Sequence, residues 1–405
     1  MLTSVESQPG TTRRDFLKFL GRGIAIGCVL PATSLLSSFE PKASLSAETE
    51  PKIFKEFLVF DRENHPVEDA FIAGKNGEFV VLKKLVKEKD GFHRKLSFQN
   101  LRTGKQTKIT TDGDSFNGNA FGKYFVYDKG VNARMKEIHL YDLEKEEDLL
   151  IDEGAGENNI RIHPSISEFN GEPIVVWTSY KDNNEPAVYG FTPSRGKFLI
   201  SPAVKNNASN INPVISGNII AWNKGAGIVF NEFEFKDGDK PGEKIFVLKE
   251  IKEASEPGVN LVNPSISPNG DKVSYRGVTP IGGFTNDRLL VGFRTPLSQK
   301  EIDNKVPSIK GPAIISGDDL FFSDNRVEKE GSPKIPHIYL TNVITDTKSH
   351  KLTHGLGETL RGVFPNPNYS NDNFNVYLIL WNDIKEGAPN NFVHAAYVSV
   401  PINVN

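Results

Sequence analysis

The sequence predicts an all-β chain folded as a β-propeller of seven four-stranded blades, closed by a strand from its N-terminal part. Three observations predict this fold: a repeated turn, a large side chain at a fixed distance after each turn, and a further pair of strand-like runs. The segment Asn263 to Arg276 shows the first two most clearly. There Pro268-Asn269-Gly270 favours a tight turn with positive φ, and the following run ends on Tyr275.

The turn glycine recurs with a mean spacing of 48 residues between Gly77 and Gly317. A period of this size with strand-like content is typical of propeller blades. The last unit lacks the glycine, and its turn is expected near Asn371 to Asn373. The first and last units match least well, so six and eight blades remain alternatives to seven. The turn glycines are Gly77, Gly122, Gly171, Gly217, Gly270 and Gly317.

A large side chain follows each turn at nearly constant spacing, and all three tryptophans of the chain occupy this position. We expect these side chains to fill the space between neighbouring blades; a platform for stacking sugars is the alternative. Polar loops and a second pair of alternating or apolar runs follow, which is typical of strands rather than helices. The side chains are Leu82, Tyr127, Trp177, Trp222, Tyr275, Phe322 and Trp381.

The closure of the ring is predicted from its two ends. The last unit, from about Arg361 to Asn405, is short, whereas Ile53 to Asp61 precedes the first turn by the length of one strand. Radial closure leaves no long sheet edge exposed. The early strand is therefore expected to complete the final blade, within a single domain that spans residues 48–405.

Residues 1–47 have the features of a twin-arginine export signal. Arg13 and Arg14 are followed at fixed spacing by Phe16, Leu17 and Lys18. A mildly apolar run and a small-residue end suited to cleavage come next. The alternatives are a retained membrane anchor, for which the run is short, and an N-terminal lipid on Cys28. We expect that the chain folds first and is then exported to the periplasm or the outside of the cell. The twin-arginine translocase would be its transient partner during export.

The composition excludes several classes of function. The chain carries a net charge of −3, which becomes about −5 without residues 1–47. This mild acidity argues against a nucleic-acid partner, which would need a concentrated basic surface. The single cysteine, Cys28, lies in the predicted signal, so we expect no disulfide and few ligands for haem, copper or iron–sulfur groups.

The segment Pro264 to Tyr275 resembles the repeat of the TolB-like, or WD40-like, propellers, which run Pro-x-x-Ser-Pro-Asp-Gly-x-x-Ile-Ala-Phe. The resemblance is good in this unit and partial in the units around Trp177, Trp222 and Phe322. It implies a propeller and leaves the ligand open. TolB also has an α/β domain before its propeller, and the short segment between Ala47 and Ile53 does not resemble one.

Familiar catalytic and metal-binding motifs are absent from the sequence. It has no Gly-x-Ser-x-Gly, phosphate-binding loop, dinucleotide-binding or His-Glu-x-x-His pattern. His350 and His354 would lie about 13 Å apart in a strand, too far for one zinc ion. The segment Asp112 to Gly118 lacks the spacing of a calcium loop and is expected to be a polar turn between blades. The sequence thus predicts no metal ligands and no cofactor, with calcium kept as an alternative.

A candidate site comes from the geometry of the repeat. The residues that begin each innermost strand and those in the loop after the second strand should surround one mouth of the central channel. The former are Asp69, Asn117, His163, Asn212, Asn263, Gly311 and Phe364, and the latter are Asp128, Lys181, Asn223, Arg276, Asp324 and Asp383. The alternative is that Asn and His cap the exposed ends of strands by bonding free backbone groups. His163, the one imidazole of the set, is the natural acid–base candidate.

Two functions follow from this interpretation. The first is an exported binding or scaffold propeller whose channel mouth, or long loops such as Gly277 to Asp287, contact an envelope protein or a small polar ligand. The binding residues would be His163, Asn212, Asn263, Arg276, Asp324 and Asp383. The alternative is a periplasmic hydrolase or lyase acting on a carbohydrate, lactone or peptide, with His163 and acids such as Asp324 or Asp383 facing the channel. No catalytic residue is assigned.

Overall fold

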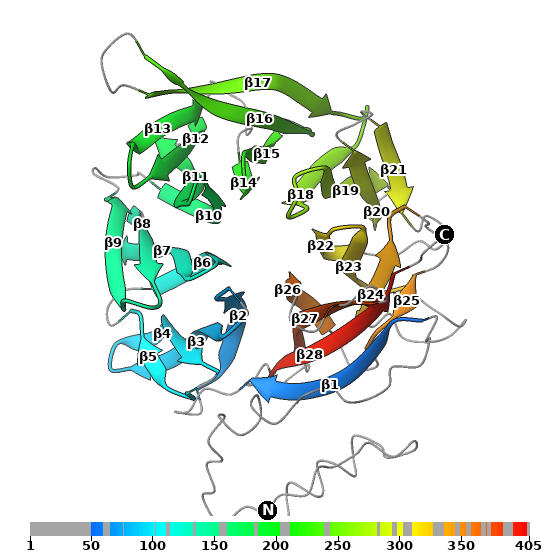
Figure 1. Cartoon of the computed structure of the whole chain (residues 1–405), viewed down its shortest axis with the longest axis horizontal. Helices are drawn as coiled ribbons and strands as arrows, with labels where there is room; N and C mark the ends of the chain where they lie inside the picture. Colours follow the sequence, from blue (N-terminus) through cyan, green and yellow to red (C-terminus); the bar gives the residue numbers. More distant parts are fainter. Residues whose placement is uncertain are drawn as a thin grey trace, which may run out of the picture.

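The computed structural model shows seven four-stranded antiparallel sheets arranged in a ring (Figure 1). The structure describes residues 50–59, 65–75, 77–101, 103–110, 114–132, 135–153, 160–181, 185–202, 211–238, 244–281, 284–293, 298–302, 310–326, 336–344, 349–353, 358–365, 370, 374–383 and 392–402. The predicted signal, with Arg13, Arg14, Phe16, Leu17 and Lys18, and the predicted turn at 371–373 lie outside these residues. No helix in the described part of the chain is long and apolar enough to cross a membrane.

The blades are numbered by the order of their innermost strands along the chain, and each innermost strand is named first. Blade 1 holds β2 (Val67–Ala73), β3 (Phe79–Glu88), β4 (Gly91–Asn100) and β5 (Gln106–Lys108). Blade 2 holds β6 (Asp114–Phe121), β7 (Tyr124–Asn132), β8 (Met135–Asp142) and β9 (Glu147–Asp152). Blade 3 holds β10 (Ile160–Phe169), β11 (Glu172–Lys181), β12 (Glu185–Thr192) and β13 (Gly196–Ser201). Blade 4 holds β14 (Ile211–Ser216), β15 (Ile219–Lys224), β16 (Gly227–Asp237) and β17 (Lys244–Ala254).

The remaining blades follow the same order. Blade 5 holds β18 (Asn260–Ile266), β19 (Lys272–Ile281), β20 (Phe284–Phe293) and β21 (Ser298–Ile302). Blade 6 holds β22 (Lys310–Ser316), β23 (Asp319–Asp324), β24 (His337–Asn342) and β25 (His350–Lys351). Blade 7 holds β26 (Glu358–Pro365), β27 (Phe374–Asp383), β28 (Phe392–Pro401) and β1 (Lys52–Val59). The predicted count of seven is confirmed, and so is the closure, because β1 forms the outer edge of blade 7 beside β28.

Seven apolar clusters, one at each junction between blades, form the core of the described residues. The seven large side chains predicted to lie between blades do so, each on the second strand of its blade and at most 2% exposed. Each of them joins the cluster that its blade shares with the preceding blade; Trp177, for example, packs with Val126 and Ile138. This burial rules out the stacking platform for these side chains, because no sugar could reach them.

The turn between the first two strands of each blade has the predicted conformation. All six turn glycines have positive φ, which side chains other than glycine rarely adopt. At Gly270 the space is also short, because a Cβ atom there would lie 2.6 Å from Cγ1 of Ile219 in the neighbouring blade. The segment Gly277 to Asp287, predicted as a loop, instead continues β19 and β20 as a hairpin, apart from residues 282–283, which lie outside the described part.

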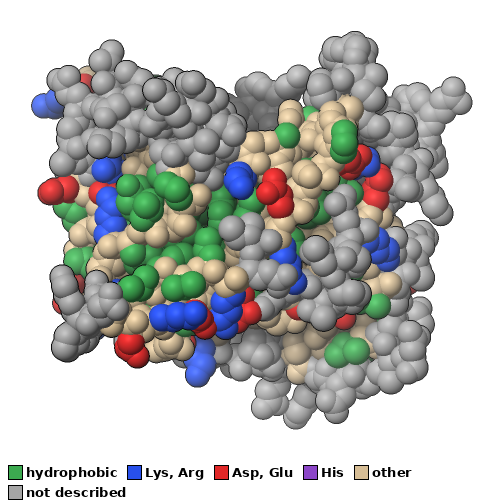
Figure 2. All heavy atoms as spheres, turned by 90° about the horizontal axis from the view of Figure 1, so that it is seen from above, with side chains coloured by type: hydrophobic (Ala, Val, Ile, Leu, Met, Phe, Trp, Pro, Cys, Tyr) green, Lys and Arg blue, Asp and Glu red, His purple; other side chains and the backbone are tan. Residues whose placement is uncertain are grey.

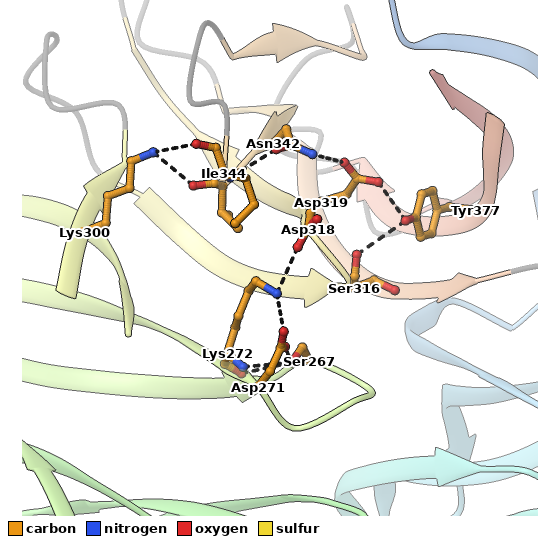
Figure 3. Close-up of polar contacts among 11 residues, drawn as sticks. Ser267, Asp271, Lys272, Lys300, Ser316, Asp318, Asp319, Asn342, Ile344 and Tyr377 are labelled. Atoms are coloured by element: carbon orange, nitrogen blue, oxygen red, sulfur yellow. Dashed lines mark hydrogen bonds and ion pairs between the residues drawn. The ribbon is translucent and has the colours of Figure 1, made fainter. Parts of the chain in front are cut away.

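Polar contacts near these turns connect blades 5, 6 and 7 (Figure 3). The ammonium group of Lys272, which is 5% exposed, lies 2.5 Å from Asp271 and 2.9 Å from Asp318 of blade 6. Tyr377 of blade 7 donates its hydroxyl proton to Asp319 of blade 6 at 2.7 Å. Burial raises the pKa of the Asp319 carboxyl, although the hydrogen bond from Tyr377 opposes this. These contacts fix the end of the ring opposite to the candidate site described below.

The outer side of the ring carries mixed chemistry. On the face shown in Figure 2, hydrophobic side chains lie among lysines, arginines and acidic groups. Between blades 3 and 4, aromatic rings extend the core outward; Phe198 and Phe246 are stacked with their ring centroids 5.0 Å apart. The innermost strands, β2, β6, β10, β14, β18, β22 and β26, each contact the two neighbouring innermost strands. This inner ring of strands positions the candidate site.

Candidate functional site

Each innermost strand carries a β-bulge or a similar irregularity near its start, where it pairs with the second strand of its blade. In blades 3, 4 and 5 the bulge contains a residue before proline with positive φ: His163 at 54°, Asn212 at 54° and Asn263 at 55°. Asn and His tolerate this conformation better than most residues, and proline disfavours a helical conformation of the residue before it. Three predicted site residues therefore occupy equivalent backbone positions.

The last blade departs from the prediction. Its irregularity lies between Leu360 and Gly362, at Arg361. Phe364 pairs with Leu378 further along the strand and packs against the apolar cluster between blades 7 and 1. Phe364 is therefore a core residue, and Arg361 takes the place predicted for it.

His163 lies close to two charged side chains of blade 2. Its ring is partly exposed, but Nδ1 is buried and has no hydrogen-bond partner among the described residues. Burial lowers the pKa of the imidazole, and the positive charge of Lys136 adds to this, whereas the negative charge of Asp128 opposes it. The imidazole is therefore neutral at pH 7, with one ring nitrogen able to accept a proton.

Asp128 is fully buried and holds the bulge of β6. Its Oδ1 accepts hydrogen bonds from the backbone N–H groups of Phe116 and Asn117, each at 3.0 Å. Its Oδ2 accepts a bond from the Asn117 amide at 2.6 Å. The ammonium group of Lys136 lies 3.9 Å from the same oxygen and 4.0 Å from the centre of the Phe116 ring. A backbone bulge, a carboxylate and a cation are thus fixed next to His163.

The charged groups continue into blades 1 and 7. Lys83 donates to the backbone carbonyl of Phe116 at 3.0 Å and lies 3.6 Å from Asp69. Arg361 of blade 7 lies 3.6 Å from the other oxygen of Asp69. We call the set that runs through blades 7, 1, 2 and 3 the charged arc: Arg361, Asp69, Lys83, Phe116, Asn117, Asp128, Lys136 and His163. The structure thus brings together Asp69, Asn117, Asp128 and His163 from the predicted set.

The predicted residues of blades 4 and 5 have other surroundings. Arg276 lies within β19 rather than in a loop, and its guanidinium group donates to Asp287 at 2.5 Å. Asp287 is buried, so the opposite charges of Arg276 and Asp287 compensate each other inside blade 5. The side chains of Asn212 and Asn263 make no hydrogen bond to any described residue. Asn212 is half-buried and Asn263 is exposed, and the structure does not join them to the charged arc.

The predicted acids of blades 6 and 7 also lie in strands. Asp324 ends β23, is 1% exposed, and accepts hydrogen bonds from the backbone N–H and Nε of Arg326 at 3.0 and 2.8 Å. The Arg326 guanidinium lies 4.1 Å from the centre of the Tyr339 ring, which fixes the pair locally. Asp383 and Lys181 are the last residues of β27 and β11, and only their backbone is described. The prediction that these positions form a loop was wrong.

The equivalent positions are instead the residues directly after the large side chains, and each of them is polar. Because neighbouring residues of a strand face opposite sides, these side chains point toward the following blade when the large one packs on the preceding blade. We call this set the polar belt: Lys83, Asp128, Thr178, Asn223, Arg276, Ser323 and Asn382. Strict alternation after each turn would have identified Thr178, Ser323 and Asn382 in place of Lys181, Asp324 and Asp383.

Members of the polar belt bond to the innermost strand of the next blade. Asn223 donates to the carbonyl of Leu261 and Asn382 to that of Glu68, both at 2.6 Å. The Ser323 hydroxyl accepts from the backbone N–H of Leu360 at 2.7 Å. The belt therefore joins blades near their bulges through hydrogen bonds, in a chain whose one cysteine lies outside the described part.

Several buried polar atoms at this end of the ring have no hydrogen-bond partner among the described residues. Most buried polar atoms in proteins have one, and an ordered water or a ligand often supplies it. The atoms are Nδ1 of His163, Oγ1 of Thr178, Oδ1 of Asn223, Nε of Arg276 and Oδ1 of Asn382. The bulged end of the ring thus keeps unused hydrogen-bonding capacity in blades 3, 4, 5 and 7.

Two positions considered for metals are only partly described. His350 begins β25, and His354 lies outside the described residues. Of the segment Asp112 to Gly118, residues 112 and 113 lie outside, and Asp114 begins β6 as part of a strand rather than of the predicted turn. The distance predicted between the two histidines therefore stays a prediction.

Comparison with known proteins identifies the fold. No protein family and no curated protein matches the sequence. Among solved structures, an oligogalacturonate lyase from Vibrio parahaemolyticus is similar with a TM-score of 0.52 and 13% identity, over 86% of this chain and 98% of that one. An oligogalacturonate lyase in complex with manganese is similar with a TM-score of 0.51 and 10% identity, over 87% and 98% of the two chains. TolB from Acinetobacter baumannii has a TM-score of 0.38 and 13% identity, over 80% of each chain. At these identities the similarity to the two lyases concerns the fold alone.

Proposed function

We propose that this chain is an exported binding propeller that takes a small polar ligand, or a charged terminus of an envelope protein, at the bulged end of blades 7, 1, 2 and 3. The observation that supports the proposal most is the position of His163. A neutral imidazole with a buried, unpaired nitrogen lies close enough to Asp128 and Lys136 to interact with both charges, at the end of a charged arc that runs through four blades. Sites with a few convergent polar groups are typical of ligand binding.

The charges of the arc suggest the chemistry of the ligand. It contains three cations, Lys83, Lys136 and Arg361, and two carboxylates, Asp69 and Asp128. A ligand with hydroxyl groups and one carboxylate could use both signs, since the excess positive charge would attract the carboxylate. Acidic sugars and peptide C-termini have this chemistry. Calcium is the alternative ligand and is included in the thermal-shift screen described next.

Replacing His163 with alanine is expected to weaken binding at least tenfold, because the imidazole with the buried, unpaired nitrogen is removed. The measurement is a thermal-shift screen of residues 48–405 with galacturonate, short peptides and calcium. A ligand at 100 times its Kd adds about 2.7 kcal/mol of stability, and a tenfold weaker variant at the same concentration should keep about 1.4 kcal/mol of it or less. His350→Ala is the matched control and should keep the whole shift. Equal shifts in wild type and His163→Ala would exclude His163 from the site.

The same variant has a pH signature without ligand. Because burial lowers the pKa of His163, the unfolded chain binds a proton at higher pH than the folded chain does. The free energy of unfolding of the wild type is therefore highest above the ordinary pKa of about 6.5, where His163 is neutral in both states. It decreases as the pH falls toward the lowered pKa of the folded state, because the unfolded chain is protonated first. Wild type should therefore lose stability relative to His163→Ala below about pH 6.5. A difference that grows in the opposite direction would contradict the neutral imidazole.

The alternative function is a hydrolase or lyase with His163 as general base. The observation that favours it is again the lowered pKa, because a neutral imidazole can remove a proton at pH 7. In the screen above, this alternative predicts consumption of a sugar or peptide by wild type. His163→Ala would then abolish turnover while its melting temperature stays nearly unchanged. Binding without turnover supports the first proposal.

We also propose that residues 1–47 direct the folded chain through the twin-arginine route. The support is the spacing of Arg13, Arg14, Phe16, Leu17 and Lys18. Replacing both arginines with lysine should retain most of the protein in the cytoplasm, because the paired guanidinium groups are the recognised feature. Fractionation of cells followed by immunoblotting measures this. Equal export of the double variant would exclude the twin-arginine route.

A further inference from the structure

The hairpin between β3 and β4 in blade 1 gathers three potential metal ligands at its tip. Glu88 pairs with Gly91 at the end of the ladder, and Asp90 lies in the short loop between them. His93 follows in β4. One ligand atom from each of Glu88, Asp90 and His93 lies within 4.8 Å of the other two. A segment of six residues thus presents two carboxylates and an imidazole to one point.

The distances between these groups fit a common ion. Nε2 of His93 lies 3.0 Å from Oδ1 of Asp90 and 3.9 Å from Oε2 of Glu88. Nitrogen and oxygen ligands that are each about 2.0–2.2 Å from one transition-metal ion lie about 3–4 Å from one another. Small rotations of the exposed Glu88 and Asp90 side chains would complete this arrangement.

A fourth residue, from blade 2, supports the assignment. Oδ1 of Asp114 lies 3.5 Å from Nδ1 of His93, on the side of the ring that faces away from Asp90. The same oxygen accepts a hydrogen bond from the backbone N–H of Arg94 at 2.6 Å, which fixes it. Histidines that bind metals commonly donate their second ring N–H to a carboxylate, and Asp114 is the carboxylate nearest to Nδ1 of His93, in ion-pair contact with it. The imidazole is therefore oriented with Nε2 toward the two ligand carboxylates.

The other oxygen of Glu88 already has a partner. Its Oε1 lies 3.3 Å from the ammonium group of Lys95, so Oε2 is the oxygen left for an ion. Three carboxylates, of Glu88, Asp90 and Asp114, face one imidazole and one ammonium group. A protonated His93 is the alternative explanation of these contacts, because its imidazole lies 3.0 Å from Asp90, 3.9 Å from Glu88 and 3.5 Å from Asp114, and the titration below separates the two explanations. A bound dication would use all four residues.

We propose that Glu88, Asp90 and His93 bind a transition-metal dication such as Zn²⁺ or Mn²⁺, with Asp114 as the residue that positions His93. The imidazole ligand favours a transition metal, because calcium and magnesium prefer oxygen ligands. Three protein ligands on an exposed hairpin leave further coordination positions to water.

The test is isothermal titration of the full chain with Zn²⁺, followed by Co²⁺ as a spectroscopic probe. We expect one saturable site and a visible Co²⁺ absorption band from nitrogen and oxygen ligands. His93→Gln should weaken Zn²⁺ binding at least tenfold and remove the band. Asp114→Asn should weaken binding about 10–100-fold, the usual effect of losing such a carboxylate. His350→Ala should bind as wild type does.

Two outcomes would overturn the proposal. One is that wild type and His93→Gln bind Zn²⁺ with the same affinity, which would mean that the ion binds elsewhere. The other is that wild type shows no saturable binding, which would leave the salt bridge as the full explanation. Far-UV circular dichroism of each variant ensures that a loss of binding is not a loss of folding. The result does not depend on the ligand proposed for the charged arc.

Discussion

Replacing Trp177 with alanine is expected to lower the free energy of unfolding by about 3–5 kcal/mol, the usual cost of removing a large buried aromatic side chain. The tryptophan is completely buried between blades 2 and 3, where it contacts Val126 and Ile138. Its indole N–H also donates to Asp152 at 3.2 Å. Urea unfolding of wild type and variant measures the difference.

The control is Phe121→Ala, because Phe121 is 43% exposed at a turn of blade 2. Its loss should change the unfolding free energy by less than about 0.5 kcal/mol. If Trp177→Ala also cost less than about 1 kcal/mol, the aromatic positions would not hold the blades together.

Deleting β1 is expected to have a still larger effect. The ladder with β28 joins seven residue pairs, from Lys52 with Ser399 to Val59 with Val393. At a net contribution of about 1 kcal/mol for each hydrogen bond, losing the strand should cost about 5 kcal/mol or more. It would also expose the edge of β28 to pairing with other chains. The measurement compares a chain beginning at Glu50 with one beginning at Asp61, by unfolding and by size-exclusion chromatography.

The deletion has a direct complement. A synthetic peptide of Lys52 to Val59, added to the shortened chain, should restore part of the unfolding midpoint, because it can occupy the vacated edge of blade 7. A scrambled peptide of the same composition should not. If the shortened chain remained monomeric and unfolded at the same urea concentration as the longer one, β1 would not be needed to close the ring.

The fold could be predicted because its signals are local. Each turn glycine, together with the large side chain about five residues later, fixes the register of two strands, and the repeat fixes the rest. The polar belt could not be placed as well. The sequence predicts loops directly after Trp177 and Phe322, whereas β11 and β23 continue past these residues. The polar positions of the strands are therefore Thr178 and Ser323 rather than residues of a loop. Phe364 was misplaced because the last unit has no glycine from which to count.

The contacts between blades could not be predicted from the sequence. Arg361 and Asp69 lie far apart in the chain and meet only because blade 7 is next to blade 1. The cluster of Glu88, Asp90 and His93 depends on where one hairpin turns, and Asp114 joins it from another blade. Such sites follow from the closed ring rather than from a motif.

The pairing of β1 with β28 also determines when the ring can close during synthesis. Lys52 and Ser399 contact each other across 347 residues of chain. At a synthesis rate of about 5–20 residues per second, the first strand emerges from the ribosome roughly 20–70 seconds before its partner. During this interval the earlier blades can stack while the ring stays open. Any chaperone that protects the nascent chain would therefore be expected to act on β1, the strand that stays unpaired for the longest time.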